Sequence, residues 1–329
     1  MISRRTMLAR TAGATTACLF AKSLLHAADA PDPPDAAGAP DATAQATPGE
    51  MLTRKIPATG EILPAMGFGT YAAMMTDGDT SEPTVAGKAA VLKAFYDAGG
   101  RVVDTAPSYG NAEEMIGITS TKLGLNDKIF ITTKVLERGG GAEAGIKSFE
   151  RSFQRLQRDK STKTIEVMQC HNFIDWATHL PTMRKWKDDG KFRYIGVTHY
   201  QNHAHEELER ILKRDKVDFL QVNYSAPEPQ AADRLLPAAR DLGVAVLINR
   251  PFVGGDVIRK AKQKPLPDFV KPFASSWAQA LLKFCLAHDA VTCVIPATGK
   301  VEHMKDNMQA GRGPLPNRSE CEQLTKLFA

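Results

Sequence analysis

The chain has 329 residues and carries 42 lysine and arginine against 37 aspartate and glutamate side chains, for a formal net charge of +5 at pH 7. The basic residues are dispersed among acidic ones, which argues against a nucleic-acid-binding surface. The cysteines lack the spacing of metal ligands, so we expect no metal site. We interpret Cys170, Cys285, Cys293 and Cys321 as core residues, with a Cys285 to Cys293 disulfide as the alternative in an oxidising compartment.

The first thirty residues predict export. Arg4 and Arg5 form a twin-arginine signature, and a weakly apolar stretch at 12–25 leads to the small residues Ala28 and Ala30. That stretch is too short and too polar for a stable membrane span. We expect residues 1–30 to be a signal peptide that engages the twin-arginine export machinery of a bacterium, so that the protein is periplasmic or otherwise exported. The alternative is a basic start that happens to precede an alanine-rich tail.

Residues 31–50 are rich in Pro, Asp, Ala and Gly, which predicts a disordered linker. From residue 51 to residue 329, short apolar runs alternate with amphipathic stretches. We predict strands at 65–68, 102–104, 129–133, 165–170, 194–197, 219–222, 244–248 and 292–295. We predict helices at 85–98, 112–123, 145–156, 180–189, 204–214, 230–242, 274–288 and 301–310, and a tail helix from Ser319.

Eight alternations of strand and helix favour a (β/α)8 TIM barrel over an open sheet, and about 280 residues is close to the usual size of one such barrel. Before the first barrel strand, short strands at 54–57 and 62–63 flank a turn at 58–61. This pattern predicts a hairpin that closes the barrel floor. We therefore assign 51–329 to one barrel domain.

Four ionisable side chains follow three successive predicted strands: Asp104, Tyr109, Lys134 and His171. The carboxyl ends of parallel strands are where α/β folds bind ligands. A lysine directly after a buried strand needs a partner, and Asp104 is available. We expect Lys134 to draw the pKa of the Tyr109 hydroxyl down from about 10 toward neutral pH, which makes it a general acid, while His171 polarises a carbonyl. Taken singly, each residue also fits a turn, a core position or a solvated charge.

These residues lie in the segments 67–71, 104–113, 133–135 and 169–173, whose combination resembles the aldo-keto reductases from about Leu52 to the C-terminus. The resemblance implies a (β/α)8 barrel and a nicotinamide cofactor bound in extended form without a Rossmann fingerprint. It implies hydride transfer to or from a carbonyl carbon. In this family pattern Tyr109 is the proton donor, Lys134 and Asp104 tune it, and His171 orients the substrate oxygen.

The resemblance also implies contacts to the nicotinamide. Thr198 and His199 stand where the family usually has a serine and an asparagine that hold the carboxamide. Gln221, at the end of the sixth predicted strand, offers an acceptor and donors to the same group. Asn249 stands where many relatives place a tyrosine that stacks on the nicotinamide, so we expect that stacking to be missing.

The loop after the seventh predicted strand is a candidate pyrophosphate site. Gly254 and Gly255 allow the backbone to approach a phosphate closely, and Arg250, followed by Pro251, supplies positive charge. An ordinary loop turn is the alternative interpretation.

The segment 295–307 resembles the part of the family that binds the adenosine 2′-phosphate and adenine. Thr298 precedes a predicted helix, where a hydroxyl and free backbone N–H groups hold an anion. The usual lysine and arginine positions are Ala297 and His303 here, and we expect Lys300 to replace the charge. The candidate contacts are Thr298, Lys300, His303, Asp306 and Asn307. NADP(H) is therefore the favoured cofactor and NAD(H) the alternative. The alternative interpretation of these residues is that they cap a helix and form a solvated charged face.

Tyr71, Leu136 and Phe173 follow the first, third and fourth predicted strands and would line an apolar slot for an aldehyde or ketone, unless they are ordinary core residues. We predict an NAD(P)(H)-dependent oxidoreductase that acts on a small carbonyl or sugar-like molecule. The alternative is an exported sensor or regulatory protein that holds the cofactor with little turnover. A barrel hydrolase or lyase would need paired carboxylates or a metal site, which we do not find in the sequence.

Overall fold

The computed structural model describes residues 49–328. The expected signal peptide at 1–30, and the linker at 31–50 apart from its last two residues, lie outside this range. Among the described residues, no helix combines the length and apolar character needed to cross a membrane.

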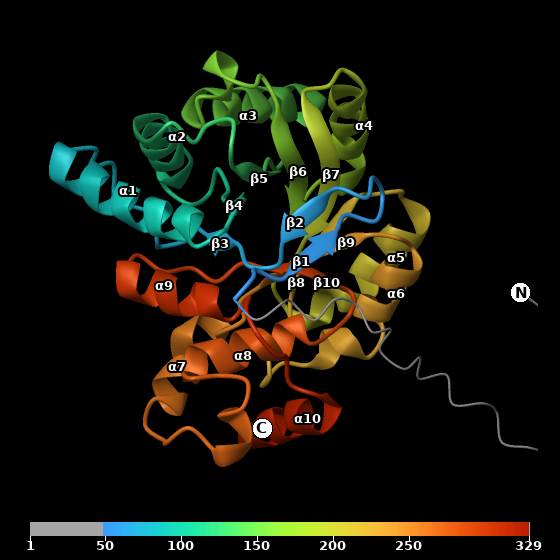
Figure 1. Ribbon diagram of the computed structural model, residues 1–329. Coiled ribbons are helices and arrows are strands. Elements are labelled where there is room, and N and C mark those ends of the chain that lie inside the picture. The colour runs from blue at the N-terminus through green and yellow to red at the C-terminus, as the bar shows by residue number, and fades with distance from the viewer. Residues whose placement is uncertain (1–48, 329) are drawn as a thin grey trace, which may run out of the picture. The chain divides into compact units, whose positions relative to one another are not determined.

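Eight parallel strands form the barrel at the centre of the fold (Figure 1). In chain order, each strand pairs with the next, and isolated parallel bridges from Met66 to Val294 and from Gly69 to Ala297 join the first strand to the last. The strands are β3 (Phe68–Gly69), β4 (Val102–Asp104), β5 (Phe130–Val135), β6 (Ile165–His171), β7 (Phe192–Thr198), β8 (Phe219–Asn223), β9 (Ala245–Asn249) and β10 (Val291–Val294). The (β/α)8 prediction is confirmed.

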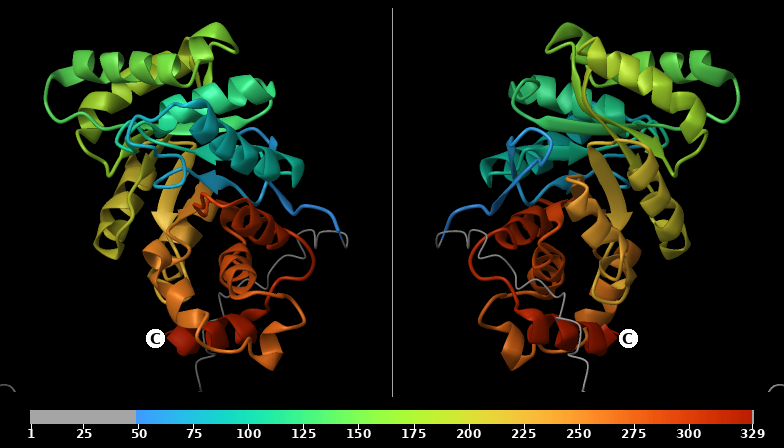
Figure 2. Two further views of the ribbon diagram at one scale, coloured as in Figure 1. Left: turned by 90° about the vertical axis from the view of Figure 1, so that its left-hand side faces the viewer. Right: turned by 90° about the vertical axis from the view of Figure 1, so that its right-hand side faces the viewer.

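Helices cover the outside of the strands, as the two side views in Figure 2 show. They are α1 (Glu82–Asp97), α2 (Ala112–Leu123), α3 (Gly141–Arg155), α4 (Trp176–Asp188), α5 (His205–Arg214), α6 (Leu235–Asp241), α7 (Asp256–Ala261), α8 (Trp277–Leu286), α9 (Val301–Gln309) and α10 (Arg318–Phe328). In α5 the buried residues Leu208, Ile211 and Leu212 recur at helical spacing, so one face packs on the barrel and the charged face meets solvent. The sequence did not predict α7, whose six residues are too few for a periodic pattern.

The hairpin of β1 (Thr53–Lys55) and β2 (Ile62–Pro64) closes the barrel floor. Ile56 and Leu63 from this hairpin share a buried apolar cluster with Val102, Phe130 and Phe219 from the barrel strands. Apolar side chains therefore fill the floor of the barrel. The polar side chains that face the barrel interior lie at the opposite end, where the strands finish.

The strand ends differ from the prediction at two positions that matter for the site. β5 continues to Val135 and β6 to His171, so Lys134 and His171 belong to the strands and do not follow them. Cys170, Cys285 and Cys293 are buried, which confirms their interpretation as core residues, whereas Cys321 is only half-buried. All four are free thiols, so the alternative disulfide is not formed.

Candidate active site

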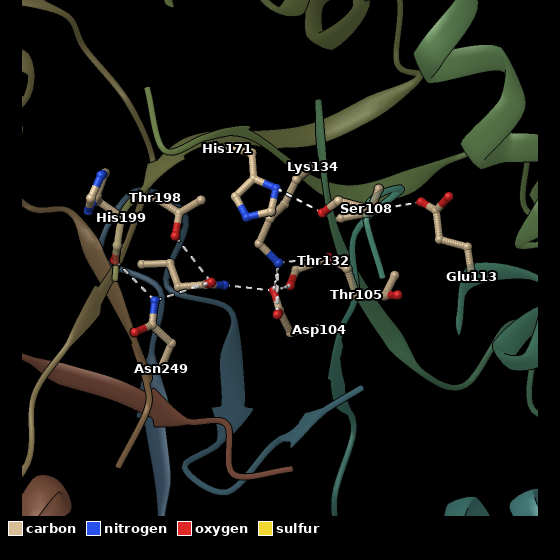
Figure 3. A network of polar contacts seen from close by, with 12 residues as sticks. Asp104, Thr105, Ser108, Glu113, Thr132, Lys134, His171, Thr198, His199 and Asn249 are labelled. Carbon is tan, nitrogen blue, oxygen red and sulfur yellow. Dashed lines mark hydrogen bonds and ion pairs between the residues drawn. The ribbon is translucent and has the colours of Figure 1, made fainter. Parts of the chain in front are cut away.

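The structure brings Asp104, Tyr109, Lys134 and His171 together at the carboxyl-terminal mouth of the barrel. Asp104 ends β4, Lys134 lies near the end of β5 and His171 ends β6, so all three side chains point to the barrel interior (Figure 3). Tyr109 comes from the loop that leads into α2, and its ring centroid lies 5.1 Å from Lys134 Nζ and 6.0 Å from the His171 ring.

A buried ion pair forms the base of the site. Lys134 Nζ donates to both carboxylate oxygens of Asp104 at 2.8 Å and to the carbonyl oxygen of Thr105 at 2.7 Å. Lys134 is 1% and Asp104 3% exposed. Thr132 and Gln221 each donate a further hydrogen bond of 2.6 Å to Asp104 Oδ1. These donors offset the cost of burying the carboxylate and hold Lys134 in one place.

The electrostatics of Tyr109 correct one expectation. Burial raises the pKa of its hydroxyl and Asp104 adds to the rise; Lys134 lowers it, but the net pKa is above 10, not closer to neutral. The prediction of a lowered pKa was wrong because it considered only the ammonium and neglected burial and the carboxylate beside it. For Lys134, burial lowers the pKa, but Asp104 and Tyr109 outweigh it, so the ammonium stays charged.

His171 is a neutral imidazole in this site. Burial, followed by the charges of Lys134 and His199, lowers its pKa to about 3. Its Nδ1 lies 3.5 Å from Ser108 Oγ. A neutral imidazole offers one N–H donor and one acceptor, so His171 can donate to a substrate oxygen without supplying a full charge.

A cleft of about 610 Å³ opens above these residues. Tyr71 stands at its rim, 62% exposed, with its ring edge-on to Tyr109 at 5.1 Å. The other predicted residues that line it are Asp104, Tyr109, His171, Thr198, Gln221, Asn249, Arg250, Pro251, Gly254 and Gly255. The lining also contains Ala72, Tyr200 and Phe252, which the sequence analysis missed, and Gly69, Thr70, Asn172, Ile295, Pro296 and Ala297, which lie in the family segments but were not predicted as contacts.

Of the residues predicted for catalysis, substrate and the nicotinamide, Lys134, Leu136, Phe173 and His199 lie outside the cleft lining. Leu136 is half-buried away from it, and Phe173 stacks on the His199 ring at 4.9 Å. His199 in turn stacks on Tyr200 at 5.4 Å with nearly parallel rings. Of this stack, Tyr200 is the member that lines the cleft.

A second cavity, of about 460 Å³, adjoins the cleft and shares Phe252, Gly255 and Ala297 with it. Together the two form a groove from the buried ion pair to α9. Of the residues predicted to contact the adenosine, Thr298, His303, Asp306 and Asn307 line the second cavity, whereas Lys300 lines neither cavity. No sequence motif marks residues 256–278, so the sequence analysis missed Ile258, Lys262, Leu266, Ser275, Ser276, Trp277 and Ala278.

A model of the aldo/keto reductase family matches residues 65–327. The chain belongs to the aldo/keto reductase family. The glyoxal reductase of Bacillus subtilis is 29% identical over 229 residues, which cover 66% of this chain and 75% of that protein. Methylglyoxal reductase YeaE of Escherichia coli is 26% identical over 262 residues, 78% and 89% of the two chains. An aldo-keto reductase of Klebsiella pneumoniae, solved in complex with NADPH, is 25% identical with a TM-score of 0.69, covering 85% and 95%.

The groove of this aldo/keto reductase fits an extended dinucleotide. Four buried polar atoms of the cleft lining have no hydrogen-bond partner among the described residues: Thr70 Oγ1, Asn172 Oδ1, Asn249 Oδ1 and Arg250 Nε. Arg250 and Val253 hold positive φ angles of 50° and 49°, which is costly for a β-branched residue such as valine. Unpartnered donors and acceptors next to a strained, glycine-containing loop are what a polar, phosphate-bearing ligand would satisfy.

At the end of the groove where the sequence predicts the nicotinamide, several polar groups already bond to one another. Gln221 Nε2 donates to Asp104, and Gln221 Oε1 accepts from Thr198 Oγ1 at 3.1 Å. Asn249 Nδ2 donates to the His199 carbonyl oxygen at 3.1 Å, which leaves Asn249 Oδ1 free. The register of β7 and β8 places Thr198 beside Gln221. Hydrogen bonds through Gln221 link Thr198 and Asn249 to Asp104, which Figure 3 labels.

Proposed function

We propose that this chain is an NADP(H)-dependent reductase that converts an aldehyde or ketone to the alcohol, with Tyr109 as the general acid. The observation that carries the proposal is the buried Lys134 and Asp104 pair directly beneath Tyr109, at the inner end of the dinucleotide-sized groove. The relatives named glyoxal and methylglyoxal reductase, and the Klebsiella pneumoniae structure with NADPH, support the substrate class and the cofactor.

The residues that would hold the cofactor are those of the groove: Thr198, Gln221 and Asn249 at the nicotinamide, the 250–255 loop at the pyrophosphate, and Thr298, Asp306 and Asn307 at the adenosine. Bound NADPH supplies a hydride to the carbonyl carbon. The buried side chains of the protein position the carbonyl group and deliver the proton.

The raised pKa of Tyr109 defines the state in which it acts. At neutral pH the phenol is protonated, so it can donate its proton to the carbonyl oxygen as negative charge develops there. Lys134, kept cationic by Asp104, then stabilises the tyrosinate that is left. The neutral His171 donates an N–H to the same oxygen and orients it.

The alternative function is an exported protein that holds the dinucleotide with little turnover. His199 and Asn249, which replace the family's usual carboxamide and stacking residues, favour this alternative. Turnover separates the two, because a sensor binds NADPH without oxidising it when aldehydes are added.

The decisive variant is Tyr109→Phe, assayed for NADPH oxidation with a panel of small aldehydes, glyoxal and methylglyoxal included. We expect it to bind NADPH like the parent and to lose about 10² to 10⁴ in rate, the usual contribution of a general acid. A variant that reduces aldehydes at the parental rate would exclude Tyr109 as the proton donor. A parent that binds NADPH but reduces no aldehyde would support the sensor.

We also infer a three-part chain: a signal at 1–30, a linker at 31–50 and a catalytic barrel at 51–329, exported through the twin-arginine machinery to the periplasm. Arg4 and Arg5, which support this, lie outside the described residues. Replacing both by lysine keeps the charge but removes the paired guanidinium groups, so the enzyme should stay active in the cytoplasmic fraction. Undiminished periplasmic activity of that variant would refute the twin-arginine route.

A further inference from the structure

The adenosine end of the groove lacks a cation where the family resemblance places one. Ala297 and His303 occupy the expected lysine and arginine positions. Lys300, which lies between these two positions in the sequence, precedes α9 as its N-terminal cap and lines neither cavity. A 2′-phosphate carries most of a second negative charge at neutral pH and needs a positive partner, which has to come from another part of the fold.

Lys262, at the end of α7, is the one lysine or arginine among the described residues that line this cavity. Lys262 lines the same cavity as Thr298 and His303, although it lies more than thirty residues earlier in the chain. Arg259 on the same helix is paired with Asp256, whereas within residues 49–328 no carboxylate pairs with Lys262. Its ammonium is therefore available to a ligand.

The segment that carries Lys262 is fixed against the cavity wall. The buried indole of Trp277 donates its Nε1–H to the carbonyl oxygen of Lys264 at 2.9 Å, and Trp277 lines the same cavity. The backbone N–H of Lys262 donates to the Ile258 carbonyl oxygen at 3.0 Å. The first contact ties the residues after α7 to the start of α8, and the second continues the helical backbone of α7 to Lys262.

One carboxylate, that of Asp306, also lines the cavity, and both of its oxygens accept hydrogen bonds from the protein. Asp306 Oδ2 accepts from Ser276 Oγ at 2.8 Å and Asp306 Oδ1 from Gln279 Nε2 at 2.6 Å. Both donors come from the start of α8, so they fix the carboxylate on that side and offset part of its repulsion of a phosphate.

We propose that Lys262 binds the adenosine 2′-phosphate and is the residue by which this enzyme prefers NADP(H) to NAD(H). Arg250, which lines the cleft on the nicotinamide side, then serves the pyrophosphate, so each charged part of the dinucleotide has its own cation. This assignment rests on the proposed function, because it requires that the groove binds a dinucleotide. The residue that selects NADP(H) over NAD(H) then lies in the segment between β9 and α8, and not in the loop after β10.

The test measures binding alone. The quenching of tryptophan fluorescence, to which Trp277 in the cavity wall contributes, is titrated with NADPH, NADH, adenosine 2′,5′-bisphosphate and adenosine 5′-monophosphate. Lys262→Ala should weaken NADPH and the bisphosphate by at least about tenfold, equivalent to one charge-assisted contact, and leave NADH and the monophosphate within about twofold. Lys262→Arg should retain the preference for the 2′-phosphate.

Two matched controls make the result specific. Lys260→Ala removes the same charge from an exposed position of the same helix outside the cavity lining, and Lys300→Ala tests the lysine between the two expected cation positions. Both should bind all four probes like the parent. Equal weakening of NADPH and NADH by Lys262→Ala, no weakening, or a selective loss in Lys300→Ala would overturn the proposal and leave the proposed function intact. A parent that binds no dinucleotide would overturn both.

Discussion

Replacing Lys134 by methionine removes a buried charge and leaves its partner behind. Lys134 Nζ makes three hydrogen bonds of 2.7 to 2.8 Å, two of them to Asp104, and both residues are almost fully buried. Truncating one member of such a pair typically costs about 3 to 5 kcal/mol, because the remaining charge has no water to solvate it. Thr132 and Gln221 still donate to Asp104, so we expect a loss of about 3 kcal/mol, at the lower end of that range.

The companion variant is Asp104→Asn in the Lys134→Met background, in which no uncompensated charge is left. It should regain most of the free energy of unfolding, measured by urea denaturation, but none of the carbonyl reduction. Lys134 lowers the pKa of Tyr109, so this pKa should rise further in Lys134→Met. The alkaline limb of the pH profile of carbonyl reduction should then move to higher pH. A single variant as stable as the parent, or a double variant that reduces aldehydes at the parental rate, would refute this account of the pair.

Two further predictions concern pH and packing. Burial, Lys134 and His199 lower the pKa of His171 from 6.5 to about 3, so between these pH values the unfolded chain binds a proton that the folded chain does not. The free energy of unfolding should therefore fall as the pH drops from 6.5 toward 3. Urea unfolding of His171→Gln should show a shallower fall over the same pH range. In α2, a Cβ at Gly117 would lie 2.1 Å from the Arg155 carbonyl oxygen, so Gly117→Ala should cost about 1 to 3 kcal/mol. Gly87→Ala in α1, where a Cβ meets nothing within 4 Å, should instead stabilise by about 0.4 to 1 kcal/mol, and equal melting temperatures for these two variants would contradict the packing argument.

The sequence alone determined the architecture of this protein. Each barrel strand is a short apolar run and most helices carry a one-sided apolar pattern, which are local signals that do not depend on distant residues. The same locality made Asp104, Lys134 and His171 recognisable, because in a parallel barrel the ends of all strands meet at one mouth. Where the pattern was too short, as in the six residues of α7, the sequence analysis found nothing.

The tertiary structure decided the properties that depend on groups far apart in the chain. The pKa of Tyr109 rises because burial and Asp104 together outweigh Lys134, a balance that no spacing of residues can show. The second cavity likewise joins the end of α7, the start of α8 and the start of α9, so Lys262 and Trp277 face the same space as Thr298. Desolvation and Coulomb interactions depend on distances in space, and only the closed barrel fixes those distances.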